Sequence, residues 1–365
     1  MNQPALFTPL AIRTVTFRNR LWVSPMCQYS VVKRDGVPTA WHNVHLGSMA
    51  VGGAGLVMTE STAVEAIGRI SPHDTGIWND EQRDAWKNVV DFITSQGAVA
   101  GIQLGHAGRK ASIYPDWNFP GASGSMPDQE GGWQTVSASA TAFDGYLPAD
   151  ELSLADIDAL VETWGQAARR AVEAGFEVIE LHAAHGYLLH QFLSPLSNLR
   201  TDEYGGPLEN RARLLLRIVE RVRDTIGDDL ALFVRVSATD WVDGGWNEAE
   251  TATTADWARA AGADLFDVSS GGNVTGVKIP VGPGYQVPLA HFVKQHSHIA
   301  TSSVGLITTS ELANEIVEDG RSDAVFIGRE MLRDPHFALR AAVELGAEID
   351  YWPAQYLRAK PQPAR

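Results

Sequence analysis

The amino-acid sequence predicts an α/β fold, a single-domain (β/α)₈ TIM barrel over residues 1–365 with a long capping loop after the third strand. Three observations support this prediction. Short apolar runs rich in Val, Ile and Leu recur along the chain. Segments with helical periodicity separate the runs, and several of these helices end at a glycine that leads into the next run. An open doubly wound sheet is the structural alternative, and a length of 365 residues also fits two domains.

The apolar runs have the pattern of strands that are buried on both faces. They lack the alternation of apolar and polar residues that marks a sheet with one solvated face, so they predict a parallel sheet enclosed by helices. Eight such runs are present, which is the number of strands in this barrel. They are Leu21–Val23, Gly55–Met58, Val99–Leu104, Val178–Leu181, Leu230–Val236, Leu265–Val268, Ile299–Ser302 and Ala324–Ile327.

The predicted helices carry start and stop signals. Ser153 precedes a helix that has Asp156 three residues later, the spacing at which a side chain and a backbone N–H cap each other. Glycines close several of the helices, as expected where the chain must turn at a helix end. The predicted limits are Asn79 and Gly97, Ser153 and Gly175, Leu208 and Ile226, Asn247 and Gly262, and Thr309 or Ser310 and Gly320.

Residues 105–152 interrupt the alternation of strands and helices. The segment is rich in Gly, Ser, Pro and Trp and is far longer than an ordinary connection between a strand and a helix. It follows the third strand, which places it at the C-terminal face of a barrel, where active sites of this fold lie. We therefore interpret it as a cap over a site.

The net charge of the protein limits the classes of partner that it can bind. Asp plus Glu is 44 and Lys plus Arg is 29, so the formal net charge is −15, which disfavours nucleic acid and anionic membrane surfaces. No apolar run of about 18 residues is present that would predict a membrane span. The single cysteine and the absence of a secretory pattern predict the reducing cytoplasm as the compartment.

The loops after the last two strands suggest a phosphate site. Gly305 follows the seventh strand, and Gly328 and Arg329 follow the eighth, which are the loops that recurrently bind phosphate in barrels. Glycine lets backbone N–H groups approach phosphate oxygens, and arginine adds a fork of donors. Two ordinary turn glycines and a surface arginine are the alternative interpretation.

Two histidines and a tyrosine follow the fourth strand. His182 and His185 could be metal ligands or a buried structural pair, but no acidic or thiol partner is conveniently placed for a metal. We favour two imidazole donors to a carbonyl or oxyanion, with Tyr187 as a proton donor. Cys27 lies at the end of the first strand, where it is expected to face the site rather than the core.

Nine segments carry further motifs. In order along the chain they are Leu21–Tyr29 (LWVSPMCQY), Trp41–Leu46 (WHNVHL), Gly53–Leu56 (GAGL), Gln103–Lys110 (QLGHAGRK), Glu180–Tyr187 (ELHAAHGY), Phe192–Arg211 (FLSPLSNLRTDEYGGPLENR), Asp267–Gly271 (DVSSG), Pro283–Val287 (PGYQV) and Gly328–Pro335 (GREMLRDP). This set resembles the Old Yellow Enzyme family of flavin-dependent ene-reductases, especially its bacterial branch of NADPH dehydrogenases and xenobiotic reductases. No G-x-G-x-x-G follows a strand, so a nicotinamide nucleotide would not be held by a dinucleotide-binding domain.

The resemblance implies a barrel that binds FMN non-covalently. Arg235 would lie beside N1 and O2 of the flavin and stabilise the negative charge of its reduced form, and Cys27 would tune its redox behaviour near the reactive edge. Gly305, Gly328 and Arg329 would hold the phosphate, in agreement with the loop argument above. The residues implied at the flavin ring are Ser24, Pro25, Met26 and Cys27 along it, and Ser61 and Gln103 at its pyrimidine side.

The resemblance also implies a ping-pong reaction. NADPH and substrate would stack in turn on the same flavin face, the first giving a hydride and the second, an α,β-unsaturated carbonyl compound, receiving it at the β-carbon. His182 and His185 would bind the carbonyl oxygen, Tyr187 would protonate the α-carbon, and Tyr29 would lie at the substrate site. The two alternatives are a metal-dependent barrel lyase that uses the histidines, and a non-catalytic flavin-binding protein.

Members of this branch pair their subunits, and the resemblance implies a homodimer or homotetramer. A C-terminal arginine would enter the active site of the neighbouring subunit, and Arg358, in the tail formed by residues 350–365, is the candidate. Arg333 matches an active-site arginine of the same branch. A small enone or related activated alkene is the implied substrate, and no metal is implied.

Overall fold

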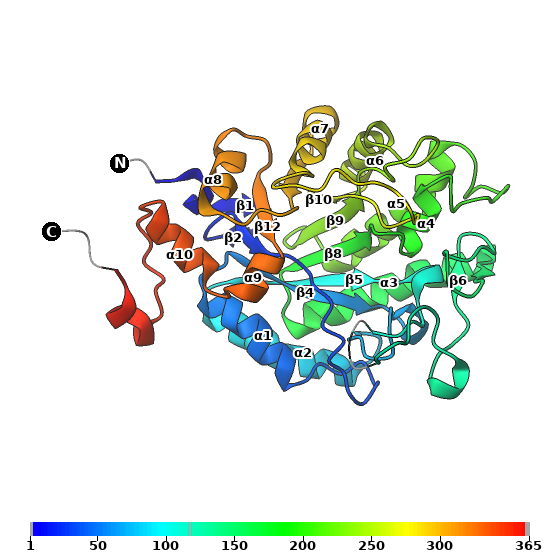
Figure 1. The fold of residues 1–365 in the computed structure, drawn as a ribbon, viewed down its shortest axis with the longest axis horizontal. Coiled ribbons are helices and arrows are strands. Elements are labelled where there is room, and N and C mark those ends of the chain that lie inside the picture. Colours follow the sequence, from blue (N-terminus) through cyan, green and yellow to red (C-terminus); the bar gives the residue numbers. More distant parts are fainter. Residues whose placement is uncertain (1–2, 116, 118, 362–365) are drawn as a thin grey trace.

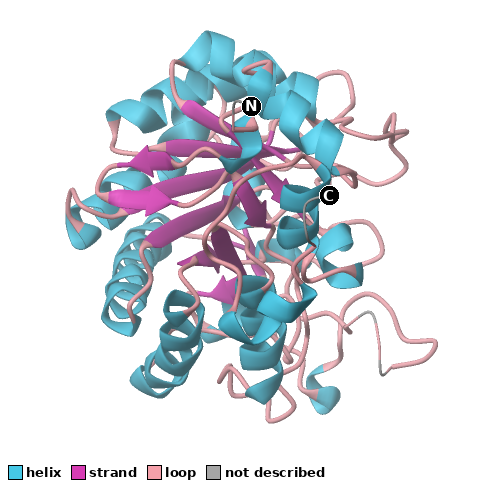
Figure 2. Ribbon diagram, turned by 90° about the vertical axis from the view of Figure 1, so that its left-hand side faces the viewer, coloured by secondary structure: helices cyan, strands magenta, loops and turns pink. Residues whose placement is uncertain are grey.

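The computed structural model describes residues 3–115, 117 and 119–361. Among these residues, eight parallel strands close into one barrel in the order β10-β11-β12-β3-β4-β5-β8-β9, with the strands at the centre and helices around them (Figure 2). This confirms the predicted (β/α)₈ fold and excludes the open sheet. The barrel strands are β3 (Leu21–Val23), β4 (Leu56–Ala63), β5 (Val99–Gly105), β8 (Val178–Ala183), β9 (Ala231–Ser237), β10 (Leu265–Ser269), β11 (Ala300–Ser303) and β12 (Ala324–Ile327).

The helices that surround the barrel include all five that the sequence predicts. Capping boxes form at the predicted N-termini of two of them, between Asn79 and Gln82 and between Ser153 and Asp156. The α-helices are α1 (Ala40–Val51), α2 (Asp80–Ser95), α3 (Leu154–Ala174), α4 (Leu188–Leu193), α5 (Leu208–Ile226), α6 (Glu248–Ala260), α7 (Val287–Ser297), α8 (Ser310–Glu318), α9 (Arg329–Arg333) and α10 (Phe337–Glu344). No helix in this part of the chain has both the length and the apolar character needed to cross a membrane.

A hairpin that the sequence analysis did not predict closes the N-terminal end of the barrel. Its strands are β1 (Leu10–Ile12) and β2 (Val15–Phe17), paired antiparallel. Phe17 packs against Trp22 with ring centroids 4.7 Å apart, and Trp22 stacks on Phe233 at 5.7 Å. These buried rings fill the barrel at this end.

The segment 105–152 lies at that C-terminal end, on the side of β6 and α4 in Figure 1. It contains η3 (Gly108–Lys110), η4 (Asp128–Glu130) and a small parallel pair, β6 (Val136–Ser137) and β7 (Asp150–Glu151). Hydrogen bonds tie it to the barrel: Ser137 Oγ donates to Gln191 Oε1 at 3.0 Å, and Thr275 Oγ1 donates to Asp144 at 2.9 Å. Residues 116 and 118 of the predicted loop lie outside the described residues.

The remaining short elements are η1 (Ala5–Phe7), η2 (Ala66–Gly68) and η5 (Ala354–Ala359). η5 belongs to the predicted C-terminal tail, of which residues 362–365 lie outside the described residues.

Candidate active site

A cavity of about 170 Å³ lies between the loops that follow β11 and β12. Gly305 has a φ of +124°, and a Cβ there would lie 3.0 Å from Gln286 Nε2 and from the Tyr285 ring, so both the backbone conformation and the close packing favour glycine. Gly328 and Arg329 line the same cavity. The Arg329 side chain is exposed, and no hydrogen bond or ion pair to another described residue engages it. All three residues predicted for phosphate therefore meet at one small cavity.

Arg235 is a buried arginine near the C-terminal end of the barrel, which we call the barrel mouth. Arg235 Nε is 3.2 Å from Asp267 Oδ2, and its Nη1 donates to Ser24 Oγ at 3.2 Å. The parallel register pairs Arg235 with Asp267 on one side and with His182 on the other. Ser302 Oγ donates to the second oxygen of Asp267 at 3.0 Å, so the carboxylate is fixed and fixes the guanidinium in turn.

Glu180 is a second buried carboxyl group, near the ion pair of Arg235 and Asp267. Gln103 Nε2 donates to Glu180 Oε1 at 2.8 Å, which leaves the amide oxygen of Gln103 as an acceptor for another group. Ser61 is the neighbour of Gln103 in the register of β4 and β5, just after a bulge. Burial, and then the charge of Asp267, raise the pKa of Glu180 to about 8, against the opposing effects of Arg235 and Gln103.

The raised pKa of Glu180 predicts a dependence of stability on pH. The unfolded chain has a Glu pKa of about 4.3, so between that pH and about 8 the native state binds the extra proton and stability falls as pH rises. Glu180→Gln removes this loss, by at most about 5 kcal/mol. The difference in urea midpoint between the variant and the wild type should therefore increase from pH 5 to pH 9; a constant difference would contradict the prediction.

Cys27 and Tyr29 lie on one side of the mouth, after β3. Burial, followed by the charges of Asp74 and Glu60, raises the pKa of the Cys27 thiol well above its ordinary value, so Cys27 is a neutral thiol. Tyr29 has a φ of +47°, and its ring packs against Trp117 of the capping segment with centroids 5.1 Å apart. Met26 is the neighbour of Gly328, whose added Cβ would lie 3.8 Å from the Met26 sulfur. Pro25 precedes Met26 in the same loop and is half-buried.

His182, His185 and Tyr187 lie together at the end of β8. The His182 ring has its centroid 5.2 Å from that of His185 and 5.0 Å from that of Tyr187, and both contacts are edge-on. Burial, and then the charge of Arg235, lower the pKa of both histidines well below the ordinary value, so both are neutral. The backbone N–H of Ala184 donates to His182 Nδ1 at 3.2 Å, which places the His182 proton on Nε2.

Ser269 lies beside the His185 ring. His185 Nε2 is 2.8 Å from Ser269 Oγ. Gln286 Oε1 accepts from Ser269 at 3.3 Å and from Ser270 at 2.6 Å, since an amide oxygen has two lone pairs. When the Ser269 proton instead turns to His185 Nε2, the His185 proton is on Nδ1, and His185, like His182, then has an N–H group that can donate to an oxygen.

Lys110, which the sequence analysis did not single out, supports the turn that follows β8. Lys110 Nζ donates to the backbone oxygens of His185 at 2.8 Å and Gly272 at 2.9 Å, and lies 5.2 Å from the centre of the Tyr187 ring. Burial, with a smaller effect of Arg109, lowers the pKa of Lys110 to about 8. Its place at the end of the QLGHAGRK motif was the available signal.

Two other groups near the mouth were also missed. His42 Nε2 is 2.8 Å from Glu60 Oε1, and both side chains are almost fully buried. The second oxygen of Glu60 accepts from the backbone N–H of Gln28 at 2.8 Å, which fixes the loop that carries Cys27. The WHNVHL motif contains His42, but only the fold brings it to Glu60.

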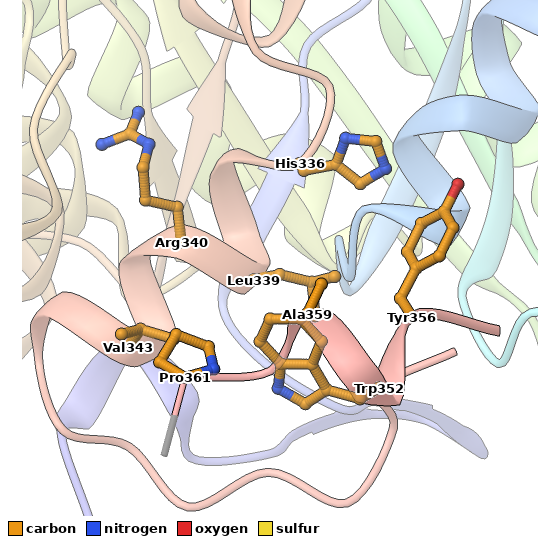
Figure 3. Close-up of a pocket in the computed structure, with 8 residues that line it drawn as sticks. All are labelled: His336, Leu339, Arg340, Val343, Trp352, Tyr356, Ala359 and Pro361. Carbon is orange, nitrogen blue, oxygen red and sulfur yellow. The ribbon is translucent and has the colours of Figure 1, made fainter. Parts of the chain in front are cut away.

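The two predicted substrate arginines lie at the end of α9 and in the C-terminal tail. Arg333 is exposed at the end of α9 and pairs with Glu330 at 2.6 Å. The tail that carries Arg358 folds back on α10, where a cavity of about 490 Å³ separates them, and Tyr356 meets the His336 ring at 5.6 Å (Figure 3). In Figure 1 this tail lies beyond α10, away from α4 and the capping segment. Arg358 therefore does not reach His182 within one chain, and its place in a neighbouring subunit stays a prediction.

The family model for NADH:flavin oxidoreductases and NADH oxidases matches residues 5–348. The chain belongs to this family. A curated NADPH dehydrogenase of Listeria welshimeri is 47% identical over 355 residues, which are 97% of this chain and 98% of the relative. The NADPH dehydrogenase of Bacillus subtilis strain 168 is 46% identical over 354 residues, with the same two shares covered.

Solved structures of NADH:flavin oxidoreductase relatives share the fold over the whole chain. Morphinone reductase has a TM-score of 0.79 at 27% identity, over 96% of this chain and 91% of its own. An Old Yellow Enzyme homologue from Zymomonas mobilis has a TM-score of 0.77 at 28% identity, over 99% and 100%. These findings confirm the predicted family, and the chain is an FMN-dependent oxidoreductase of the NADPH dehydrogenase type. The alternatives of a barrel lyase and a non-catalytic flavin protein are not retained.

The residues at the barrel mouth fit FMN. The cavity at Gly305 and Gly328 is small and has an exposed guanidinium on its rim, which suits a phosphate group. Arg235 supplies a buried positive charge, and Gln103 supplies an unused amide oxygen, both at the depth of the barrel strands. Within the described part of the chain, no group of three or more His, Cys, Asp or Glu side chains is arranged to hold a metal ion.

Proposed function

We propose that this enzyme is an ene-reductase, which uses NADPH to reduce the activated C=C bond of α,β-unsaturated carbonyl compounds by a ping-pong mechanism. The observation that supports it most is the grouping of two neutral histidines and a tyrosine at the mouth that also carries Arg235. Bound FMN supplies the hydride chemistry, by accepting from the nicotinamide and giving to the alkene. The protein supplies binding, orientation and proton transfer.

His182 and His185 bind the carbonyl oxygen of the substrate in this proposal. Their N–H groups draw electron density toward that oxygen, which makes the β-carbon electrophilic and stabilises the negative charge that develops on the oxygen. Neutral imidazoles suit this role, because they donate a hydrogen bond without giving up the proton; their lowered pKa supports this assignment. Tyr187 donates its hydroxyl proton to the α-carbon, and Tyr29 and Trp117 bound the pocket from the side of the capping segment.

The proposal also assigns residues to the ring, the pyrimidine side and the phosphate of FMN. Ser24, Pro25, Met26 and Cys27 would line the ring, and Ser61 and Gln103 would bond its pyrimidine side. Arg235 would stabilise negative charge at that side, and Gly305, Gly328 and Arg329 would hold the phosphate. A partner subunit in a homodimer or homotetramer would contribute Arg358 to a pocket that includes Arg333. We place the enzyme in the cytoplasm.

The first test is the redox behaviour of the purified protein. It should be yellow, and NADPH should bleach the flavin absorbance without oxygen; an added enone such as 2-cyclohexenone should restore the colour. A panel of enones, maleimides and nitro compounds, assayed with NADPH and NADH, would define the substrate class. Flavin that NADPH reduces but that no activated alkene reoxidises would overturn the ene-reductase assignment while leaving the dehydrogenase intact.

His182→Ala should weaken the binding of phenols to the oxidised enzyme. A phenolate resembles the enolate-like oxygen of the reaction, and loss of a hydrogen bond to a charged group costs about 1.5–3 kcal/mol, or roughly 10- to 150-fold in affinity. Titration of p-hydroxybenzaldehyde, followed by the flavin spectrum, measures this. His296→Ala, at an exposed site on α7, is the matched control. Equal phenol affinities in the two variants would argue against the oxyanion role of His182.

A further inference from the structure

The imidazole of His190 connects a buried carboxylate to the turn that carries His185 and Tyr187. His190 lies in α4 with no exposed surface, and its Nε2 is 3.1 Å from Oδ1 of Asp240, whose side chain is equally buried. The other ring nitrogen, Nδ1, accepts a hydrogen bond of 2.9 Å from the backbone N–H of Gly186. A backbone N–H can only donate, so the proton of the neutral imidazole is on Nε2, which faces Asp240.

Asp240 itself is held in one orientation. Its Oδ2 accepts from Ser194 Oγ at 2.6 Å and from the backbone N–H of Trp246 at 3.0 Å. Burial acts to raise the pKa of this carboxyl group, but the hydrogen bonds from His190 and Ser194 outweigh burial and leave the pKa below its ordinary value. Oδ1 is therefore a charged oxygen that lies 3.1 Å from His190 Nε2.

The turn at Gly186 has a backbone conformation that needs support from its surroundings. His185 has a φ of +59° and Gly186 a φ of +73°, so two consecutive residues are left-handed, and side chains rarely adopt this conformation. The His190 ring holds the N–H of Gly186, and Gln191 Nε2 donates to its C=O at 2.7 Å. Two neighbouring side chains of α4 thus hold the peptide groups on both sides of Gly186.

We propose that Asp240 and His190 are positioning residues, which set the orientation of His185 and Tyr187 by fixing the tautomer of His190. The inference rests on the proposed function, because both side chains are fully enclosed and act only through residues to which that function assigns roles. The turn at Gly186 requires the His190 proton to be on Nε2. If the imidazole proton moved to Nδ1, two N–H groups would face each other across 2.9 Å, and the turn at Gly186 would have to shift.

Asp240→Asn tests this requirement. Because Oδ2 accepts hydrogen bonds from Ser194, Trp246 and Asn273, the amide oxygen of the new side chain takes its place, and the NH₂ group faces His190 Nε2. The imidazole proton then moves to Nδ1 and opposes the Gly186 N–H, as in enzymes where a wrong histidine tautomer costs activity. We expect the FMN-loaded variant to bind p-hydroxybenzaldehyde at least about 10-fold more weakly, and to lose hydrogen-exchange protection at the Gly186 amide.

A double-mutant cycle separates positioning from folding. In His190→Asn the side-chain oxygen replaces Nδ1 and accepts from Gly186 without help from Asp240. Adding Asp240→Asn to that variant should change phenol affinity by less than about 2-fold. Asp264→Asn, which breaks an ion pair of 2.7 Å with Arg223 before β10, is the control for lost stability and should leave phenol affinity and Gly186 exchange unchanged.

The outcomes are distinguishable. Unchanged Gly186 exchange in Asp240→Asn would overturn the inference, and so would an equal effect of that substitution with and without His190→Asn. If Asp240→Asn does not fold, His190→Gln removes the acceptor for Gly186 while keeping a donor to Asp240, and the same loss of Gly186 protection is expected. A wild type that binds no phenol and reduces no enone would refute the proposed function, whereas Gly186 exchange would still decide the positioning.

Discussion

Tyr187→Phe should slow the reduction of an enone by about 10²- to 10⁴-fold, the usual contribution of a positioned general acid. Tyr187 is the N-cap residue of α4, and its ring meets the His182 ring at 5.0 Å, so its hydroxyl group is at the same mouth as the two N–H donors. Phenylalanine keeps the ring and its contact with Lys110 and removes the hydroxyl group that carries the proton. Reduction of the flavin by NADPH needs no proton from this residue and should change by less than about 3-fold.

Rapid-mixing spectroscopy measures the two half-reactions of this variant separately. Flavin bleaching by NADPH reports the first, and reoxidation by 2-cyclohexenone reports the second. Tyr351→Phe makes the same change at a half-buried tyrosine that bonds to Asn19, remote in sequence and structure from His182, and should affect neither rate. If reoxidation of the Tyr187→Phe enzyme kept the wild-type rate, another group would have to supply the proton.

Arg235→Met should lower the free energy of unfolding at pH 7 by about 3–5 kcal/mol, because removing one partner of a buried ion pair leaves the other charge uncompensated. Asp267 has no exposed surface, and Ser302 fixes its second oxygen, so it cannot turn toward water. Methionine fills a similar volume without a charge. The same variant should bind FMN more weakly, since it lacks the cation proposed to face the ring.

Arg235→Met with Asp267→Asn provides the matched test. The double variant removes both charges and should recover most of the lost stability of the protein without FMN, but none of the lost FMN affinity. Urea unfolding of the FMN-free protein and fluorescence titration of FMN give the two quantities. The stability loss of the single variant should also shrink at acidic pH, where Asp267 can take up a proton. A single variant as stable as wild type at pH 7 would show that the pair is not coupled.

The barrel strands could be predicted because their burial requires a composition that is visible locally. All eight apolar runs became barrel strands, with ends that differ mostly by one or two residues. β4 is the exception: it continues through Thr59–Ala63, whose polar side chains are buried at the barrel mouth. Polar residues that are buried for function do not carry the apolar signal of a strand.

The sequence analysis did not predict the strands β1, β2, β6 and β7 or the helices α1, α4, α7, α9 and α10. For the β1–β2 hairpin and for α1 the reason is identifiable. The β1–β2 hairpin has three-residue strands, and its turn places Arg13 at a φ of +54° without a glycine to mark it. α1 begins with a capping box in which His42, rather than Glu or Gln, returns the bond to Thr39. In both cases the tertiary contacts of the segment outweigh weak local signals.

The sequence by itself determined the fold class, the phosphate loops and the set of residues at the strand ends, because barrel topology assigns those positions whatever the contacts between side chains. The tertiary structure alone decided which charges pair and where the imidazole protons of His182 and His190 lie. Arg235 meets Asp267 and His190 meets Asp240 only through strand register and loop closure. Burial then shifts the pKa of Glu180, Lys110 and the two histidines, and that shift depends on the packing around them, which no local pattern encodes.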